Sequence, residues 1–244
     1  MPANSNFQQA IQEAQRHSIV GPNVLRKALP VLGGGMVLTA AGVLGGLSLM
    51  ATSPALFTPL FFVAIIGNLV LFFIAQNAAL KGNNSTALPL LTTYSLITGF
   101  TLSGIVAMAI GTAGIGAIAT AALATGATFV AASIFGRRMS DDVGQSLGAV
   151  VGLGILGLLI AIVVQLVGSL IFPGFGGGAF QLMIAGFGTV IFVAAAFVDF
   201  YTMPRTYRDD QYLAGALGMY LTYINLLILM LQLRIALNGG GRRE

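Results

Sequence analysis

The sequence has 244 residues, of which 57% are hydrophobic and only 7% are charged, and it contains no cysteine. Because soluble domains carry about 25% charged residues, this composition excludes a water-soluble fold and predicts an integral membrane protein without disulfides or thiolate metal sites. The net charge of +4 is spread over short connections, which is typical of a membrane topology signal and argues against nucleic-acid binding.

Residues 1–27 form a polar amino-terminal tail. The tail lacks the basic segment and apolar run of a secretory signal, so we expect it to be retained. Its only histidine, His17, has no cluster of other metal ligands beside it and is expected to be solvated. Helical spacing of a few apolar residues indicates either a weak amphipathic helix on the membrane surface or a disordered tail. These apolar residues are Phe7, Ala10, Ile11 and Ala14.

Seven apolar segments follow the tail. Each has 23 to 28 residues, against the about 20 that a helix needs to cross the bilayer core. The alternation of a membrane barrel is absent, so the sequence predicts an all-α domain of seven transmembrane helices over residues 28–237, with a short polar tail at residues 238–244. The expected spans are Ala28–Thr52, Pro54–Ala79, Leu88–Ile110, Ala113–Phe135, Gln145–Phe172, Phe180–Met203 and Tyr212–Leu237.

Basic residues alternate between the connections. If the tail and the second, fourth and sixth connections lie on one side, that side holds eight of the eleven Lys and Arg residues. The positive-inside rule then predicts a cytoplasmic amino terminus and an external carboxyl terminus. The eight are Arg16, Arg26, Lys27, Lys81, Arg137, Arg138, Arg205 and Arg208, and the other three are Arg234, Arg242 and Arg243.

The sequence gives no support for catalysis or a bound cofactor. The segment Gly152–Gly157 matches the dinucleotide-binding string, but it lies inside a span without the strand and acid that this motif needs, so we interpret it as close helix packing. No histidine lies in a span, which excludes Ser–His proteolysis there. Lys27 and Lys81 lie in polar stretches, so a retinal Schiff base is not expected. We therefore predict a protein that is not an enzyme and holds no metal.

Asp199 is the only acid inside an apolar segment, and such residues are functional candidates by default. Three interpretations are open. Asp199 is an interfacial carboxylate that pairs with Arg205 or Arg208, a titratable gate at the cytoplasmic mouth of a polar cavity, or a residue that serves structural packing. Desolvation would favour its neutral form and a nearby arginine its carboxylate. Pro204 is expected to end this helix at Met203.

The last span, Tyr212–Leu237, carries polar groups along most of its length. Thr222, Asn225 and Gln232 share or border one helix face and would be poorly placed toward lipid. The sequence therefore predicts that other helices surround this span. Elsewhere in the spans, Ser, Thr, Asn and Gln side chains are expected to form hydrogen bonds between helices.

Four short pieces, in this order, resemble the Bax inhibitor-1 family, also called the transmembrane Bax-inhibitor-motif family. The similarity runs from Val24 to Leu237, and the ordered set at matching spacing is what makes it specific. The pieces are Leu25–Lys27, Leu96–Ser103, Phe135–Asp141, and Asp199 followed by Tyr220–Leu226.

The resemblance implies a seven-helix fold with the last helix in the centre. Family members are described as pH-sensitive calcium leaks and as protectors against cell-death or envelope stress, and two aspartates pair near their cytoplasmic face. Asp199 matches the first aspartate, but Thr222 stands near the position of the second, and the second span offers no basic residue to hold an acid. Bacterial relatives that lack the second acid are suspected of a role in membrane-protein quality control.

Two functions therefore stand as expectations. One is a leak for calcium or other cations, with Asp199 as the gate and Thr222, Asn225, Arg205 and Arg208 as the positions of its partners. The other is a regulator that does not transport and that contacts a membrane protease or other membrane proteins. Either would be a multi-pass protein of a cell membrane, and the bacterial relatives point to the inner membrane.

Overall fold

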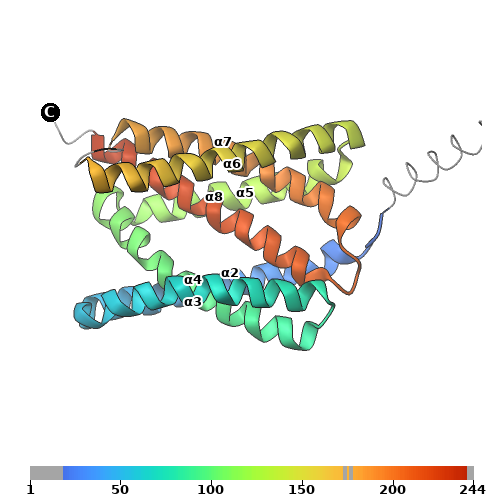
Figure 1. The fold of residues 1–244 in the computed structure, drawn as a ribbon, viewed down its shortest axis with the longest axis horizontal. Helices are drawn as coiled ribbons and strands as arrows, with labels where there is room; N and C mark the ends of the chain where they lie inside the picture. Colours follow the sequence, from blue (N-terminus) through green and yellow to red (C-terminus); the bar gives the residue numbers. More distant parts are fainter. Residues whose placement is uncertain (1–18, 173–174, 176–177, 241–244) are drawn as a thin grey trace, which may run out of the picture.

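A computed structural model describes residues 19–172, 175 and 178–240 of the chain. In these residues, seven helices are long and apolar enough to cross a membrane (Figure 1). This confirms the predicted all-α fold with seven spans. The expected amphipathic or disordered segment of residues 1–18 lies outside the described residues. The helices are α2 (Val24–Thr52), α3 (Pro54–Leu80), α4 (Asn84–Ala113), α5 (Ile115–Phe135), α6 (Asp141–Ile171), α7 (Ala179–Thr206) and α8 (Tyr212–Gly240), with a 3₁₀ turn η1 (Gly136–Arg138) after α5.

Helix α7 continues past Pro204, so the prediction that this proline would end the helix at Met203 is wrong. A proline removes one backbone donor, but the Tyr207 N–H still donates to the Met203 carbonyl oxygen (3.1 Å). The helix ends at Thr206. At 1.5 Å per residue, this places Asp199 about 10 Å from the helix end and deeper in the span than expected.

Helix α8 is the central helix, as the sequence predicted. It packs against α2, α3, α4, α5 and α7, and in Figure 1 it runs diagonally between the α2–α4 group and the α6–α7 pair. It is the most buried of the described spans. Helix α6 instead packs mainly on α7 at the edge of the bundle and turns most of its aliphatic side chains outward. The large, fully buried side chains of α8 are Leu213, Leu217, Met219, Tyr220, Leu226 and Leu231.

Hydrogen bonds from polar side chains join α2, α3, α4 and α8. The hydroxyl groups of Thr39 and Tyr220 share a 2.6 Å hydrogen bond, and Thr39 also donates to the Ser95 carbonyl oxygen (3.1 Å). Asn68 Nδ2 donates to Thr98 Oγ1 (2.9 Å). Since an unsatisfied polar group in lipid costs several kcal/mol, these contacts favour one arrangement of α2, α3, α4 and α8.

Two glycines bring α2 and α4 into backbone contact. A Cβ atom on Gly99 would overlap the Thr39 carbonyl oxygen, and one on Gly42 would overlap the Leu96 carbonyl oxygen. The neighbour in each case is backbone, which cannot rotate away. Small residues at such crossings are typical of membrane helices, because close approach of backbones replaces the hydrophobic drive that lipid does not supply.

Gly99→Ala is expected to lower the free energy of unfolding by about 1–3 kcal/mol, because overpacking forces a backbone shift. Thermal unfolding in detergent, followed by the loss of helical signal, measures this change. Gly67→Ala is the matched control, since a Cβ on Gly67 meets no atom within 4 Å. Equal melting temperatures for Gly99→Ala and the wild type would contradict the close crossing.

Only part of the segment Gly152–Gly157 serves close helix packing. A Cβ atom on Gly154 would overlap the Ile191 side chain of α7, whereas Gly152 and Gly157 have open space beside them. The packing interpretation therefore applies to Gly154. The other two glycines lie on faces of α6 that no described neighbour covers.

Candidate functional site

Asp199 lies on α7 with its side chain partly buried in the bundle, and its Oδ2 atom is fully buried without a hydrogen-bond partner in the described part of the chain. The hydroxyl group of Thr222, on the central helix, lies within hydrogen-bonding reach of the carboxyl group. The structure thus brings together Asp199 and Thr222, which the sequence proposed as gate and partner. A carboxyl oxygen with spare hydrogen-bonding capacity is suited to bind a proton, a water molecule or a passing cation.

Tyr207 and Gln76 complete a polar cluster around Asp199. Tyr207 follows the end of α7, and its hydroxyl group lies within reach of the Gln76 side chain on α3. Gln76 Oε1 is buried without a hydrogen-bond partner in the described residues. Burial raises the pKa of Tyr207, and the nearby Asp199 carboxyl group raises that pKa further. The phenol therefore stays neutral at physiological pH. We call Gln76, Asp199, Tyr207 and Thr222 the Asp199 cluster.

Arg205 contacts another acid. Its Nη2 atom lies 3.1 Å from Asp141 Oδ1 at the start of α6, and its guanidinium group stacks on the Tyr201 ring. The Tyr201 hydroxyl group also donates to Asp141 Oδ1 (2.9 Å). Arg205 therefore ties the end of α7 to the start of α6. In the described residues, no ion pair joins Arg205 to Asp199.

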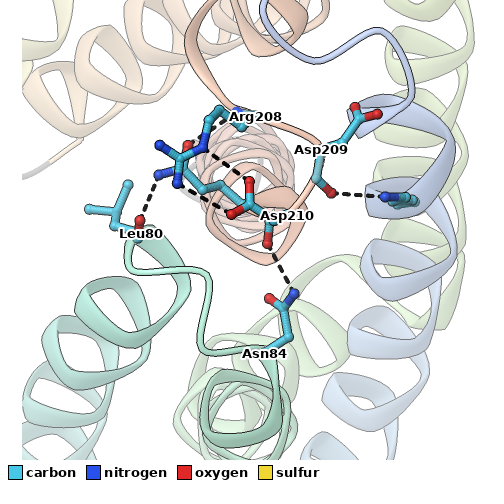
Figure 2. Close-up of polar contacts among 7 residues, drawn as sticks. Leu80, Asn84, Arg208, Asp209 and Asp210 are labelled. Carbon is cyan, nitrogen blue, oxygen red and sulfur yellow. Dashed lines mark hydrogen bonds and ion pairs between the residues drawn. The ribbon is translucent and has the colours of Figure 1, made fainter.

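Arg208 also lies away from Asp199. Its Nε and Nη2 atoms donate to the two carboxylate oxygens of Asp210 at 3.1 and 3.2 Å (Figure 2). These contacts raise the pKa of Arg208 and lower the pKa of Asp210. The two candidate arginines thus leave Asp199 without a cation among the described residues. A buried ion without a counter-charge is costly, so the missing partner is what distinguishes Asp199 from Asp141 and Asp210, which both pair with an arginine.

The loop that carries Tyr207 is fastened on two sides, and we call residues 207–211 the clasp loop. On one side, Asp209 accepts hydrogen bonds from the Asn23 N–H (2.9 Å) and from Asn23 Nδ2 (3.0 Å), and its carbonyl oxygen accepts one from Lys27 Nζ (3.0 Å). On the other side, the Asp210 carbonyl oxygen accepts a hydrogen bond from Asn84 Nδ2 (3.0 Å). Figure 2 shows the loop between the start of α2 and the α3–α4 connection.

The clasp loop keeps its charges across the physiological range. The hydrogen bond from Asn23 lowers the pKa of Asp209, so this carboxylate stabilises the folded contact above its ordinary pKa of about 3.9 and loses it only as pH falls through the lowered value. A pH far below neutral would be needed to release the loop. A pH response near neutrality must therefore come from another group.

Asn225 lies one turn beyond Thr222 on α8. It lines a cavity of about 450 Å³ between α6, α7 and α8. The sequence placed Asn225 among the partners of Asp199, whereas the structure groups it with other amides in this cavity. Among the described residues, no group of three or more His, Cys, Asp or Glu side chains could hold a metal ion.

Three residues of the site could not be picked out from the sequence. They are Gln76 and Tyr207 of the Asp199 cluster and Asp209 of the clasp loop. Gln76 was grouped with the polar residues that form hydrogen bonds between helices, and no spacing distinguishes it from them. Tyr207 and Asp209 belong to a charged loop that reads as a solvated connection. Gly21, just before α2, was a weak signal of a close backbone contact at this point. The structure shows the reason for a glycine there, because a Cβ atom on Gly21 would overlap the Tyr207 carbonyl oxygen.

Comparison with known proteins gives a match over nearly the whole chain. The family model described as "Inhibitor of apoptosis-promoting Bax1" matches residues 21–240. An uncharacterised membrane protein of Streptococcus pyogenes serotype M1 is 29% identical over 181 residues, which cover 71% of this chain and 73% of the relative. An uncharacterised protein of Helicobacter pylori strain 26695 is 29% identical over 203 residues, which cover 81% of this chain and 84% of the relative.

Proposed function

The chain belongs to the Bax inhibitor-1 family of membrane proteins, and from this premise we propose that it is a regulated cation leak whose gate lies at Asp199. The observation that carries the proposal is the buried, unpartnered Oδ2 atom of Asp199 inside a membrane span. A carboxyl group in such a place is costly and typical of ion or proton pathways.

The Asp199 cluster supplies what a gate requires. Asp199 contributes a titratable charge, Thr222 contributes a hydroxyl group from the central helix, and Tyr207 and Gln76 contribute neutral polar groups nearby. Calcium takes six to eight oxygen ligands when it is held firmly. A cluster with one carboxyl group is suited to passage and not to storage.

We further propose that the cluster faces the cytoplasm. The clasp loop and the α3–α4 and α5–α6 connections carry four Lys and Arg residues, and Arg205 in the last turn of α7 is a fifth at the same end of the bundle. The positive-inside rule assigns such connections to the cytoplasm. Reporter fusions after Lys27 and at the carboxyl end are expected to report opposite sides, with the Lys27 fusion inside. Signals from the same side would contradict this orientation. The five residues are Lys81, Arg137, Arg138, Arg205 and Arg208.

Flux in liposomes tests the leak. Vesicles containing only the purified protein are expected to take up calcium or monovalent cations faster than empty vesicles. The control is protein heated until its helical signal is lost and then reconstituted at the same ratio. Uptake no faster than in empty vesicles, for every cation tried, would overturn the proposal.

A second candidate function has one observation in its favour. Thr222 stands beside Asp199 where the resemblance implies a second aspartate, so the paired-carboxyl switch is absent. This favours a membrane regulator that acts through contacts with a protease or other membrane proteins and does not transport ions. The liposome experiment separates the two functions, because a regulator of this kind produces no flux when purified alone.

A further inference from the structure

A second polar feature is the cavity of about 450 Å³ between α6, α7 and α8, whose lining includes no residue of the Asp199 cluster. Helices α7 and α8 pack closely on each other, whereas α6 reaches the bundle mainly through α7. The space between α6 and α8 is therefore not closed by direct packing of these two helices. Its lining includes Gln181, near the start of α7, and Asn225, in the middle of α8.

Four carboxamide side chains from three helices line this cavity. They are Gln165 of α6, Gln181 of α7, and Asn225 and Gln232 of α8, and the remaining lining is aliphatic or aromatic. Polar side chains inside a membrane span face the bundle interior or a water-filled cavity and not lipid. The convergence of four amides therefore indicates such a space between these helices.

Three of these amides lack hydrogen-bond partners among the described residues. In the described part of the chain, the side chains of Gln181, Asn225 and Gln232 form no hydrogen bonds with protein groups, although each is half-buried. A polar group without a partner in hydrocarbon costs several kcal/mol. An acyl chain from the bilayer cannot supply the missing hydrogen bonds. The cavity volume has room for on the order of ten water molecules.

The cavity lining carries no charge. None of its described residues is acidic or basic, so an ion that entered would lose hydration without meeting a counter-charge, which is strongly unfavourable in a low-dielectric surrounding. An amide both donates and accepts hydrogen bonds, which suits a neutral molecule that does the same. We propose that this cavity is a hydrated site that takes water and small uncharged solutes with hydrogen-bonding groups, and that it discriminates against ions of either sign.

This site is independent of the proposed leak and can be tested in a protein that shows no flux. The chain has no cysteine, so each single-cysteine variant carries one thiol. Asn225→Cys and Gln232→Cys would be treated with three water-soluble thiol reagents of similar size, one neutral, one cationic and one anionic. Ile115→Cys, exposed at the start of α5, serves as the accessible reference. Val163→Cys, exposed on α6, serves as the lipid-facing reference.

The neutral reagent is expected to label both cavity variants well above Val163→Cys. Relative to Ile115→Cys, both charged reagents are expected to react with Asn225→Cys at least about tenfold more slowly than the neutral reagent, because an ion in this lining has no compensating charge. Cavity thiols as unreactive as Val163→Cys would show a dry or closed cavity and overturn the inference. Equal relative rates for neutral and charged reagents would overturn the discrimination against ions.

Discussion

Asp199→Asn is expected to abolish the pH dependence of cation flux between pH 5 and 8 while leaving the helical fold intact. Asparagine keeps the shape of the side chain and removes its exchangeable proton. The arginine nearest in sequence pairs with Asp141 and therefore remains paired in the variant. In the described part of the chain, no other acid lies inside an apolar stretch of the spans. Flux measured in liposomes across this pH range, for wild type and variant, gives the result.

Thr222→Asp adds a second carboxyl group at the position beside Asp199. Two adjacent carboxyl groups titrate as a coupled pair, with apparent values that belong to the pair. The flux of this variant should therefore vary over a different pH range from that of the wild type. Thr222→Asn is its matched control, because asparagine has nearly the same shape as aspartate and no titratable proton.

His17→Ala removes the only histidine of the chain, the residue type whose charge ordinarily changes near physiological pH. Its pH profile should match the wild type if Asp199 carries the response. Identical pH profiles for the wild type, Asp199→Asn and Thr222→Asp would remove Asp199 from the mechanism. Loss of the response in His17→Ala alone would place the sensor in the tail. Loss of the response in Asp199→Asn alone would identify Asp199 as the sensor.

The architecture could be predicted from the sequence because membrane insertion imposes strong rules on composition. Spans of the observed length must be apolar, and polar groups such as Thr222 and Asn225 must turn away from lipid, which predicted a central α8. The end of α7 could not be predicted from Pro204, since the helix continues to Thr206 despite the backbone donor that the proline removes.

The candidate site was predicted only in its centre. Asp199 stands out in the sequence because acids inside apolar segments are rare. The partners of Arg205 and Arg208 depend on where Asp141 and Asp210 come to lie, and local spacing carries no information about Asp141, which is distant in the chain. The placement of Tyr207 and Gln76 near Asp199 depends on contacts between segments that are distant in the chain, which no periodic pattern encodes.

Tyr207→Ala is expected to raise flux by about tenfold if, as we propose, the Tyr207 side chain covers Asp199 in the closed arrangement. The Tyr207 ring packs against the main hydrophobic core, and its hydroxyl group lies within reach of Gln76. Removing a buried aromatic ring costs about 3–5 kcal/mol where the ring is fully packed. About 1.4 kcal/mol of that difference, if it is lost only from the closed arrangement, changes the population of the open state tenfold.

Tyr207→Phe separates the ring from the hydroxyl group. If the ring is the cover, Tyr207→Phe should conduct like the wild type, whereas Tyr207→Ala should conduct faster at every pH. The double variant Tyr207→Ala with Asp199→Asn should combine fast flux with no pH dependence, since cover and titratable group act at successive points. The clasp loop should remain in place throughout, because Asp209 and Asn23 hold it through contacts that do not involve the ring. Flux of Tyr207→Ala equal to that of the wild type, in protein with unchanged helical signal, would show that the barrier to cations lies elsewhere in the bundle.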